Sequence, residues 1–199
     1  MLTHVKELPP GYTPAGGVSI KKASDIMHML VWSIVLPLIC IIAIILILRP
    51  NASSSGVFEF TSGSMFRFLG GILLVTVGML ILHEGLHGLV FWLTTREAPK
   101  FEFKWYYASA SPGEWYLARR PFMIATLLPL IAITLIGLVL LPFFNGFWRT
   151  MLILLIVFNA SGAAGDLLVA LRLAKLPPET LARDTGSEVA FYAPPQAAK

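Results

Sequence analysis

Residues 68–93 read FLGGILLVTVGMLILHEGLHGLVFWL, and Glu84 is the one acidic or basic residue in this stretch. A helix needs roughly 20 apolar residues to cross a hydrocarbon core of about 30 Å. Two further stretches, 27–48 and 122–144, contain no Asp, Glu, Lys or Arg, and a third, 150–171, contains Asp166 as its one charged residue. We therefore expect four membrane-spanning helices, at about 27–48, 68–93, 122–144 and 150–172.

The composition excludes an ordinary soluble domain. Of the 199 residues, 56% are hydrophobic and 13% are charged, and a soluble fold would need four oversized buried helices with almost no polar faces. The sequence predicts an all-α integral membrane protein with one four-helix domain over residues 27–173. The polar segment 1–26 is too long for the start of a cleaved signal. We expect this segment and 174–199 to be flexible tails.

The basic residues indicate an orientation. Of 15 Lys and Arg residues, Arg49, Arg67 and Arg149 alone fall in the two loops on one side of the four spans. The positive-inside rule then places both termini and the middle loop in the cytoplasm, in a multi-pass protein of the cell membrane. Topology and contact with anionic membrane lipid account for the net charge of +4. The chain has no nucleic-acid motif, and we expect no nucleic-acid partner.

The middle loop has the pattern of a strand. Phe101, Phe103 and Trp105 alternate with polar residues and a tyrosine, which is the period of a half-buried strand. Residues 111–113, Ser-Pro-Gly, indicate a turn. One interpretation is a short amphipathic β-hairpin, or interfacial segment, resting on the membrane surface through its aromatic residues. The other is a platform that binds an extended substrate by strand addition.

A polar motif interrupts the second span. His83 and His87 are four residues apart, so they share one helix face and can bind one metal ion. Glu84 follows the first histidine and can act as the general base that takes a proton from the attacking water. Charged and polar residues are costly inside a membrane helix and usually mark function. A hydrogen-bonded cluster or a proton relay between helices is the structural alternative.

A catalytic zinc site takes three protein ligands and keeps one position open. Asp166 is the one acidic residue of the fourth span, and its depth, about 10 Å from the cytoplasmic end, matches that of His87 at about 9 Å. We predict Asp166 as the third ligand, with Glu114 as a weaker substitute. Asn159, two turns before Asp166, is a candidate for binding substrate or for an interhelical hydrogen bond.

Other polar candidates have no metal-binding pattern. His4 and His28 have no partner at ligand spacing, and Cys40, the sole cysteine, lies in an apolar span. We therefore treat all three as non-ligands.

The motif of His83, Glu84 and His87, with Asn159 and Asp166 in a later helix, resembles the site-2 protease class of intramembrane zinc proteases. The layout from Phe68 to Leu173 is more similar to a small membrane family described as putative zincin peptidases. The resemblance implies Zn²⁺ at the two histidines and Asp166, Glu84 as the base, and cleavage of peptide bonds in or near the bilayer. Site-2 proteases carry Asn-Pro and Leu-Asp-Gly elements, which this chain lacks.

Together these features predict an intramembrane zinc metalloprotease that hydrolyses membrane-associated protein or peptide substrates. A zinc hydrolase of a lipid or another small amphiphile would use the same residues. A non-enzymatic transporter or scaffold is the remaining alternative.

Overall fold

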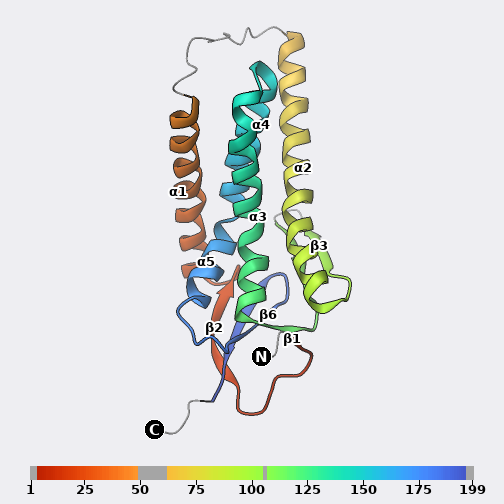
Figure 1. Cartoon of the computed structure of the whole chain (residues 1–199), viewed down its shortest axis with the longest axis vertical. Coiled ribbons are helices and arrows are strands. Elements are labelled where there is room, and N and C mark those ends of the chain that lie inside the picture. Colours follow the sequence, from red (N-terminus) through yellow and green to blue (C-terminus); the bar gives the residue numbers. More distant parts are fainter. Residues whose placement is uncertain (1–3, 49–61, 105–106, 196–199) are drawn as a thin grey trace.

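The computed structural model describes residues 4–48, 62–104 and 107–195. Long helices run side by side along the long axis of the molecule, and strands from both ends of the chain gather at one end of them (Figure 1). The helices are α1 (Ala23–Leu48), α2 (Ser62–Thr95), α3 (Arg119–Leu140), the short 3-10 helix η2 (Leu141–Phe143), α4 (Gly146–Gly162) and α5 (Ala164–Leu173). The fold is therefore mostly helical, as the sequence predicts.

Three helices are long and apolar enough to cross a membrane, namely α1, α2 and α3. A fourth span exists only if α4 and α5 count as one, because they meet at an angle of 44°. Many large apolar side chains on these helices point outward; Phe66, Leu74 and Val139 are 78%, 69% and 68% exposed. Such broad apolar exposure suits contact with lipid rather than water.

A five-stranded antiparallel sheet lies at the end of the helices where the N- and C-termini are found (Figure 1). Its spatial order is β1-β5-β6-β7-β2. The strands are β1 (His4–Val5), β5 (Tyr116–Ala118), β6 (Leu181–Asp184), β7 (Glu188–Ala193) and β2 (Thr13–Ser19). Because of this sheet, the predicted all-α class is wrong, and four of its strands lie in the segments that we expected to be tails.

The sheet and the helices share a hydrophobic core. Leu117 and Phe191 from the sheet pack with Phe91, Phe122 and Leu173 from α2, α3 and α5, and all five are at most 2% exposed. Burying a side chain of this size contributes roughly 1.5–3 kcal/mol. The ends of the chain are therefore part of the folded domain and hold the ends of three helices together.

A separate hairpin, β3 (Lys100–Lys104) and β4 (Tyr107–Ser111), follows α2. It confirms the predicted strand at residues 101–104; Trp105, the last residue of the alternating pattern, lies outside the described residues. The predicted turn forms at Gly113, which has φ +72°, but it links β4 to β5 rather than closing the hairpin. The ring of Phe101 packs so close to Gly88 of α2 that a Cβ there would lie 2.7 Å from it.

Proline residues provide polar links between the helices. Pro37 in α1 has no backbone N–H, so the carbonyl of Ser33, four residues earlier, has no helical partner. The hydroxyl of Ser161 in α4 donates to this carbonyl at 3.1 Å. The bond joins α1 to α4 just before α4 ends at Gly162.

An ion pair fixes α5 to α1 and β2. Arg172 donates to a carboxylate oxygen of Asp25 at 2.7 Å and to the carbonyl of Gly17 at 2.7 Å. Asp25 also accepts the backbone N–H of Ser19, and it is 1% exposed. The orientation of α5 is thus set by contacts with both the first helix and the sheet.

Ending the chain after Leu176 should destabilise the protein, because it removes β6 and β7, leaves β2 without a partner strand and leaves β5 paired with β1 alone. We expect the melting temperature of the purified protein to fall by more than about 5 °C. A chain ended after Pro195 is the control and should melt like the full chain. Equal melting temperatures for the two truncations would show that the sheet contributes nothing to stability.

Candidate metal centre

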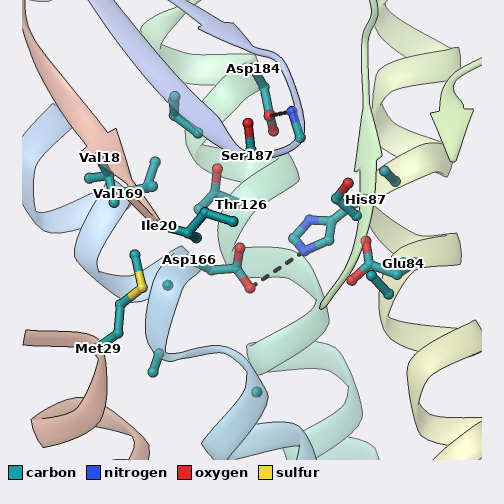
Figure 2. Close-up of a pocket in the computed structure, with 18 of the residues that line it drawn as sticks. Val18, Ile20, Met29, Glu84, His87, Thr126, Asp166, Val169, Asp184 and Ser187 are labelled. Carbon is teal, nitrogen blue, oxygen red and sulfur yellow. Dashed lines mark hydrogen bonds and ion pairs between the residues drawn. The ribbon is translucent and has the colours of Figure 1, made fainter. Parts of the chain in front are cut away.

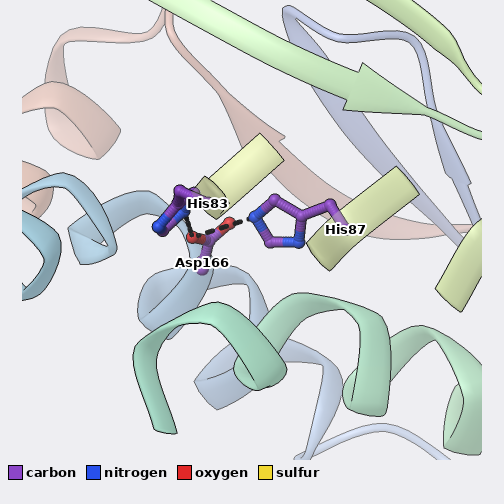
Figure 3. Close-up of side chains that lie close together, drawn as sticks. All are labelled: His83, His87 and Asp166. Carbon is purple, nitrogen blue, oxygen red and sulfur yellow. Dashed lines mark hydrogen bonds and ion pairs between the residues drawn. The ribbon is translucent and has the colours of Figure 1, made fainter. Parts of the chain in front are cut away.

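Two imidazoles of α2 point toward the aspartate of α5 (Figure 3). His83 and His87 lie one turn apart on α2, with ring centroids 4.9 Å apart, and both are buried. Oδ2 of Asp166 is 3.1 Å from Nε2 of His83 and 3.4 Å from Nε2 of His87. The structure therefore brings together the three side chains that we predicted as metal ligands.

The break between α4 and α5 positions the aspartate. α4 ends at Gly162 and α5 begins at Ala164, so Asp166 lies in the first turn of a new helix that is bent by 44° from the previous one. Small residues at the break, Gly162, Ala163 and Gly165, leave little side-chain bulk there. The bend gives one short carboxylate access to a neighbouring helix.

The geometry fits a divalent metal ion. One donor atom from each of His83, His87 and Asp166 lies within 4.8 Å of the other two. Tetrahedral zinc with ligand bonds of about 2 Å would hold its donors roughly 3.3 Å apart, close to the two distances from Asp166. Two neutral imidazoles and one carboxylate are also a donor set that zinc commonly takes. The residues present therefore fit a catalytic-type zinc site.

Hydrogen bonds behind the histidines orient their rings. Nδ1 of His83 lies 2.9 Å from Oδ1 of Asn159, and Nδ1 of His87 lies 2.8 Å from the carbonyl oxygen of Ala125. Both partners are acceptors, so each Nδ1 carries the proton and donates it. Each Nε2 then keeps its lone pair for a metal.

The partner of His87 depends on a proline. In α3 the carbonyl of Ala125 would normally accept from the backbone of residue 129, but Pro129 has no N–H. The freed carbonyl accepts from His87 instead. The one sign of this contact in the sequence is that a proline follows Ala125 by four residues. We did not predict the contact from it.

Asn159 lies behind the site and does not line the cavity. It is fully buried, its oxygen faces His83, and its amide nitrogen donates to the carbonyl of Pro129 and to the hydroxyl of Thr134, both at 3.3 Å. No group of this side chain is left to contact a substrate. Of the two roles predicted for Asn159, its contacts favour the interhelical hydrogen bond, which orients His83.

Glu84 lies beside the three ligands on α2. It is 7% exposed, it lines the cavity, and the backbone amide of Ala110 on β4 faces its carboxylate. The remaining sequence candidates lie elsewhere. Glu114 is exposed on the turn between β4 and β5, His4 stacks edge-on against Trp115, and His28 contacts the backbone of its own helix. None of these three belongs to the metal group found among the described residues.

A cavity of about 420 Å³ contains the site. His87, Glu84 and Asp166 face it from the helices, while Asp184 and Ser187 face it from β6, β7 and their connection (Figure 2). Apolar side chains complete the wall near α1, β2 and α5; they include Val18, Ile20, Met29 and Val169. The sheet therefore closes the end of the cavity, which no pattern in the sequence indicated.

The connection between β6 and β7 packs on the β3–β4 hairpin. Gly186 has φ +88°, and a Cβ there would lie 2.9 Å from the hydroxyl oxygen of Ser109. A side chain at this position would strain the backbone and separate the two hairpins. The two hairpins thus meet next to the cavity.

Asp184 is a half-buried acidic group on the sheet side of the cavity. Burial raises the pKa of this carboxyl to about 7, against the opposing effect of the Gly186 backbone N–H that donates to it at 2.7 Å. The charged groups that act on it are His87, which lowers the pKa, and Asp166 and Glu84, which raise it. Asp184 therefore exchanges its proton near neutral pH.

The fold and the site define the class: a mostly helical protein with long apolar helices and a zincin-type site, in which two histidines and an aspartate can hold a metal ion and a glutamate lies beside them. The profile of the family described as putative zincin peptidase matches residues 76–181, more than half of the chain. The protein belongs to this family. No curated protein and no solved structure matches the chain.

Replacing Asp166 with alanine should abolish stoichiometric zinc binding, because two imidazoles alone hold zinc poorly. Asn159→Ala should weaken zinc binding by about 10- to 100-fold, since it removes only the acceptor behind His83. Competition titration with a chelating dye measures both affinities, and Glu114→Gln is the control that should bind zinc like the original protein. Unchanged affinity in Asp166→Ala would contradict the ligand assignment.

Asp184→Asn should change the pH dependence of stability. Between about pH 4 and pH 7 the folded protein keeps a proton on Asp184 that the unfolded chain has released, so the free energy of unfolding falls as the pH rises through this window. The asparagine can still accept from Gly186 but does not titrate. The melting temperature of the variant minus that of the original protein should therefore increase by about 5 °C from pH 5 to pH 8. An equal difference at both pH values would show that Asp184 does not titrate in this range.

Proposed function

We propose that this protein is a zinc metallopeptidase that hydrolyses peptide bonds of membrane-associated substrates at a site within its own membrane domain. The observation that carries the proposal is the convergence of His83, His87 and Asp166 beside Glu84 in one cavity. Membership of the putative zincin peptidase family supports the hydrolytic chemistry. The similarity to site-2 proteases in the motif and its helical setting supports the intramembrane location.

We propose that α4 and α5 together form a fourth, bent span. Both termini, the five-stranded sheet and the β3–β4 hairpin then lie on the cytoplasmic side, in agreement with the distribution of Lys and Arg. His87 precedes the end of α2 at Thr95 by eight residues, or about 12 Å of helix. The site would lie a few turns below the cytoplasmic surface, surrounded by membrane lipid and within reach of membrane proteins and peptides.

A bound zinc ion would supply a Lewis acid that activates water and polarises the substrate carbonyl. The residues of the chain supply the proton transfers and the geometry. Glu84 takes a proton at its carboxylate and delivers it to the leaving amine nitrogen. Asn159 and the Ala125 carbonyl keep the imidazoles oriented, and the buried cavity strengthens the electrostatic interactions within it.

Strand β4 supports a peptide as the substrate. Ala108 and Ala110 line the cavity, and Ala110 faces Glu84. In a hairpin closed by two residues, alternate residues point their backbone groups away from the partner strand, and by the register with β3 these are Ala108 and Ala110. An extended peptide could pair with this edge of β4 and lie across Glu84.

The apolar wall of the cavity favours a second candidate, hydrolysis of a lipid or another small amphiphile. Met29, Phe122 and Val169 could hold an acyl chain next to the same ligands and base. Lipid substrates have no backbone to pair with β4. Substrate competition in one vesicle preparation, with peptide and phospholipid products both measured, separates the two candidates.

Glu84→Gln should abolish peptide hydrolysis, with a loss of at least about 100-fold in kcat, while zinc content stays unchanged because Glu84 is not a ligand. The assay uses the purified protein in lipid vesicles with membrane-peptide substrates and mass spectrometry of the products. Glu114→Gln, an exposed acid on the turn after β4, is the matched control and should retain full activity. Equal hydrolysis by Glu84→Gln and the original protein would refute the proposed function.

A further inference from the structure

The cavity has two chemically different walls. Near α1, β2 and α5 it is apolar, with Ile20, Met29 and Val169 grouped on one side (Figure 2). On the sheet side it has Asp184 and Glu188, from β6 and β7. A ligand that fills the cavity therefore contacts apolar side chains on one side and acidic side chains on another.

On the sheet side, no lysine or arginine lies among the described residues that line the cavity to balance Asp184 and Glu188. The described residues that line the cavity include four acids, Glu84, Asp166, Asp184 and Glu188, and no lysine or arginine. A divalent ion at the metal site would offset the charges of Glu84 and Asp166. The half-buried Asp184 and the exposed Glu188 on the sheet side would then remain as acids without a lysine or arginine beside them in the cavity lining.

Asp184 is held in position to act on a ligand. Its Oδ1 accepts the backbone N–H of Gly186 at 2.7 Å, which orients the carboxylate at the connection between β6 and β7. Figure 2 shows this side chain beside Ser187, on the side of the cavity from which the sheet approaches His87. Asp184 is half-buried, and partly removing a carboxylate from water without a cationic partner is costly, so a ligand that brings a positive charge would recover part of that cost.

We infer that Asp184 and Glu188 bind the side chain of a lysine or arginine in the substrate, next to the apolar residues that fill the wall formed by α1, β2 and α5. The inference rests on the proposed function and names its substrate class. An apolar stretch followed by a basic residue is the composition found at the cytoplasmic ends of membrane-spanning segments. The substrate is therefore the cytoplasmic end of a membrane helix.

Binding tests the inference separately from cleavage. Three labelled membrane peptides differ only in the residue after the apolar stretch, which is Lys, Gln or Glu. Their affinities are measured for zinc-loaded Glu84→Gln protein in vesicles of neutral lipid, so that lipid charge does not attract the peptides. We expect the Lys peptide to bind at least about tenfold more tightly than the Glu peptide.

Asp184→Asn and Glu188→Gln, each added to Glu84→Gln, should reduce this ratio, and the double change should bring it close to one. Glu179→Gln is the matched control, because Glu179 is exposed in the loop before β6 and does not line the cavity. It should leave the ratio unchanged. Glu188→Lys should reverse the preference toward the Glu peptide, a gain that misfolding cannot produce.

Equal affinity for the three peptides, or a ratio that survives the double change, would overturn the inference. Cleavage of the same peptides by the protein with Glu84 intact is scored separately. Cleavage that requires Glu84 but shows no charge preference would support the proposed function and reject this inference. A charge preference in binding without Glu84-dependent cleavage would do the reverse, supporting a cation-selective cavity and rejecting the peptidase.

Discussion

The structure depends on burying three polar side chains between apolar helices without leaving their hydrogen-bonding groups unsatisfied. His83, His87 and Asp166 come from two helices, and in an apolar environment each unsatisfied group costs several kcal/mol. Asn159 and a free backbone carbonyl accept from the Nδ1 atoms of the two histidines, and a bound metal ion would satisfy their Nε2 atoms together with Asp166. Every helix that contacts the site is placed by these requirements as much as by apolar packing.

Breaks in helical hydrogen bonding make those contacts possible. Pro129 frees the carbonyl that His87 uses, Pro37 frees the one that Ser161 uses, and the bend at Ala163 turns Asp166 toward α2. Inside a regular helix each carbonyl already accepts one backbone N–H, whereas a carbonyl four residues before a proline has no such donor and is free for a neighbouring helix. Here the irregular positions are the ones that connect the bundle.

The sheet joins the two ends of the chain to the site. Strands from residues 4–19, 116–118 and 181–193 combine into one layer, and the connection between β6 and β7 forms part of the cavity wall. The site is therefore assembled from apolar helices that position the ligands and from a polar sheet that shapes the space above them. In the proposed orientation, the first part lies in the membrane and the second in the cytoplasm.

The sequence alone predicted the long apolar helices and the three side chains that meet at the candidate metal centre. Long runs without charge define spanning helices by length alone, and the spacing of His83 and His87 places both on one face by helical periodicity. Asp166 could be identified because carboxylates are so rare in these spans. The uncharged runs and the histidine spacing are local features of the sequence. The pairing of Asp166 with the histidines depends only on how deep each residue lies along parallel helices.

Only the tertiary structure revealed the sheet, the role of Asn159 and the acidic wall at Asp184. Strands β1, β5 and β6 have two, three and four residues, too few to show a period, and the pairing of β1 with β5 joins residues more than 100 positions apart. Likewise, Asn159 has the same sequence neighbours whether it faces substrate or a histidine. Such features arise from contacts between distant segments, and a linear pattern cannot encode which segments will meet.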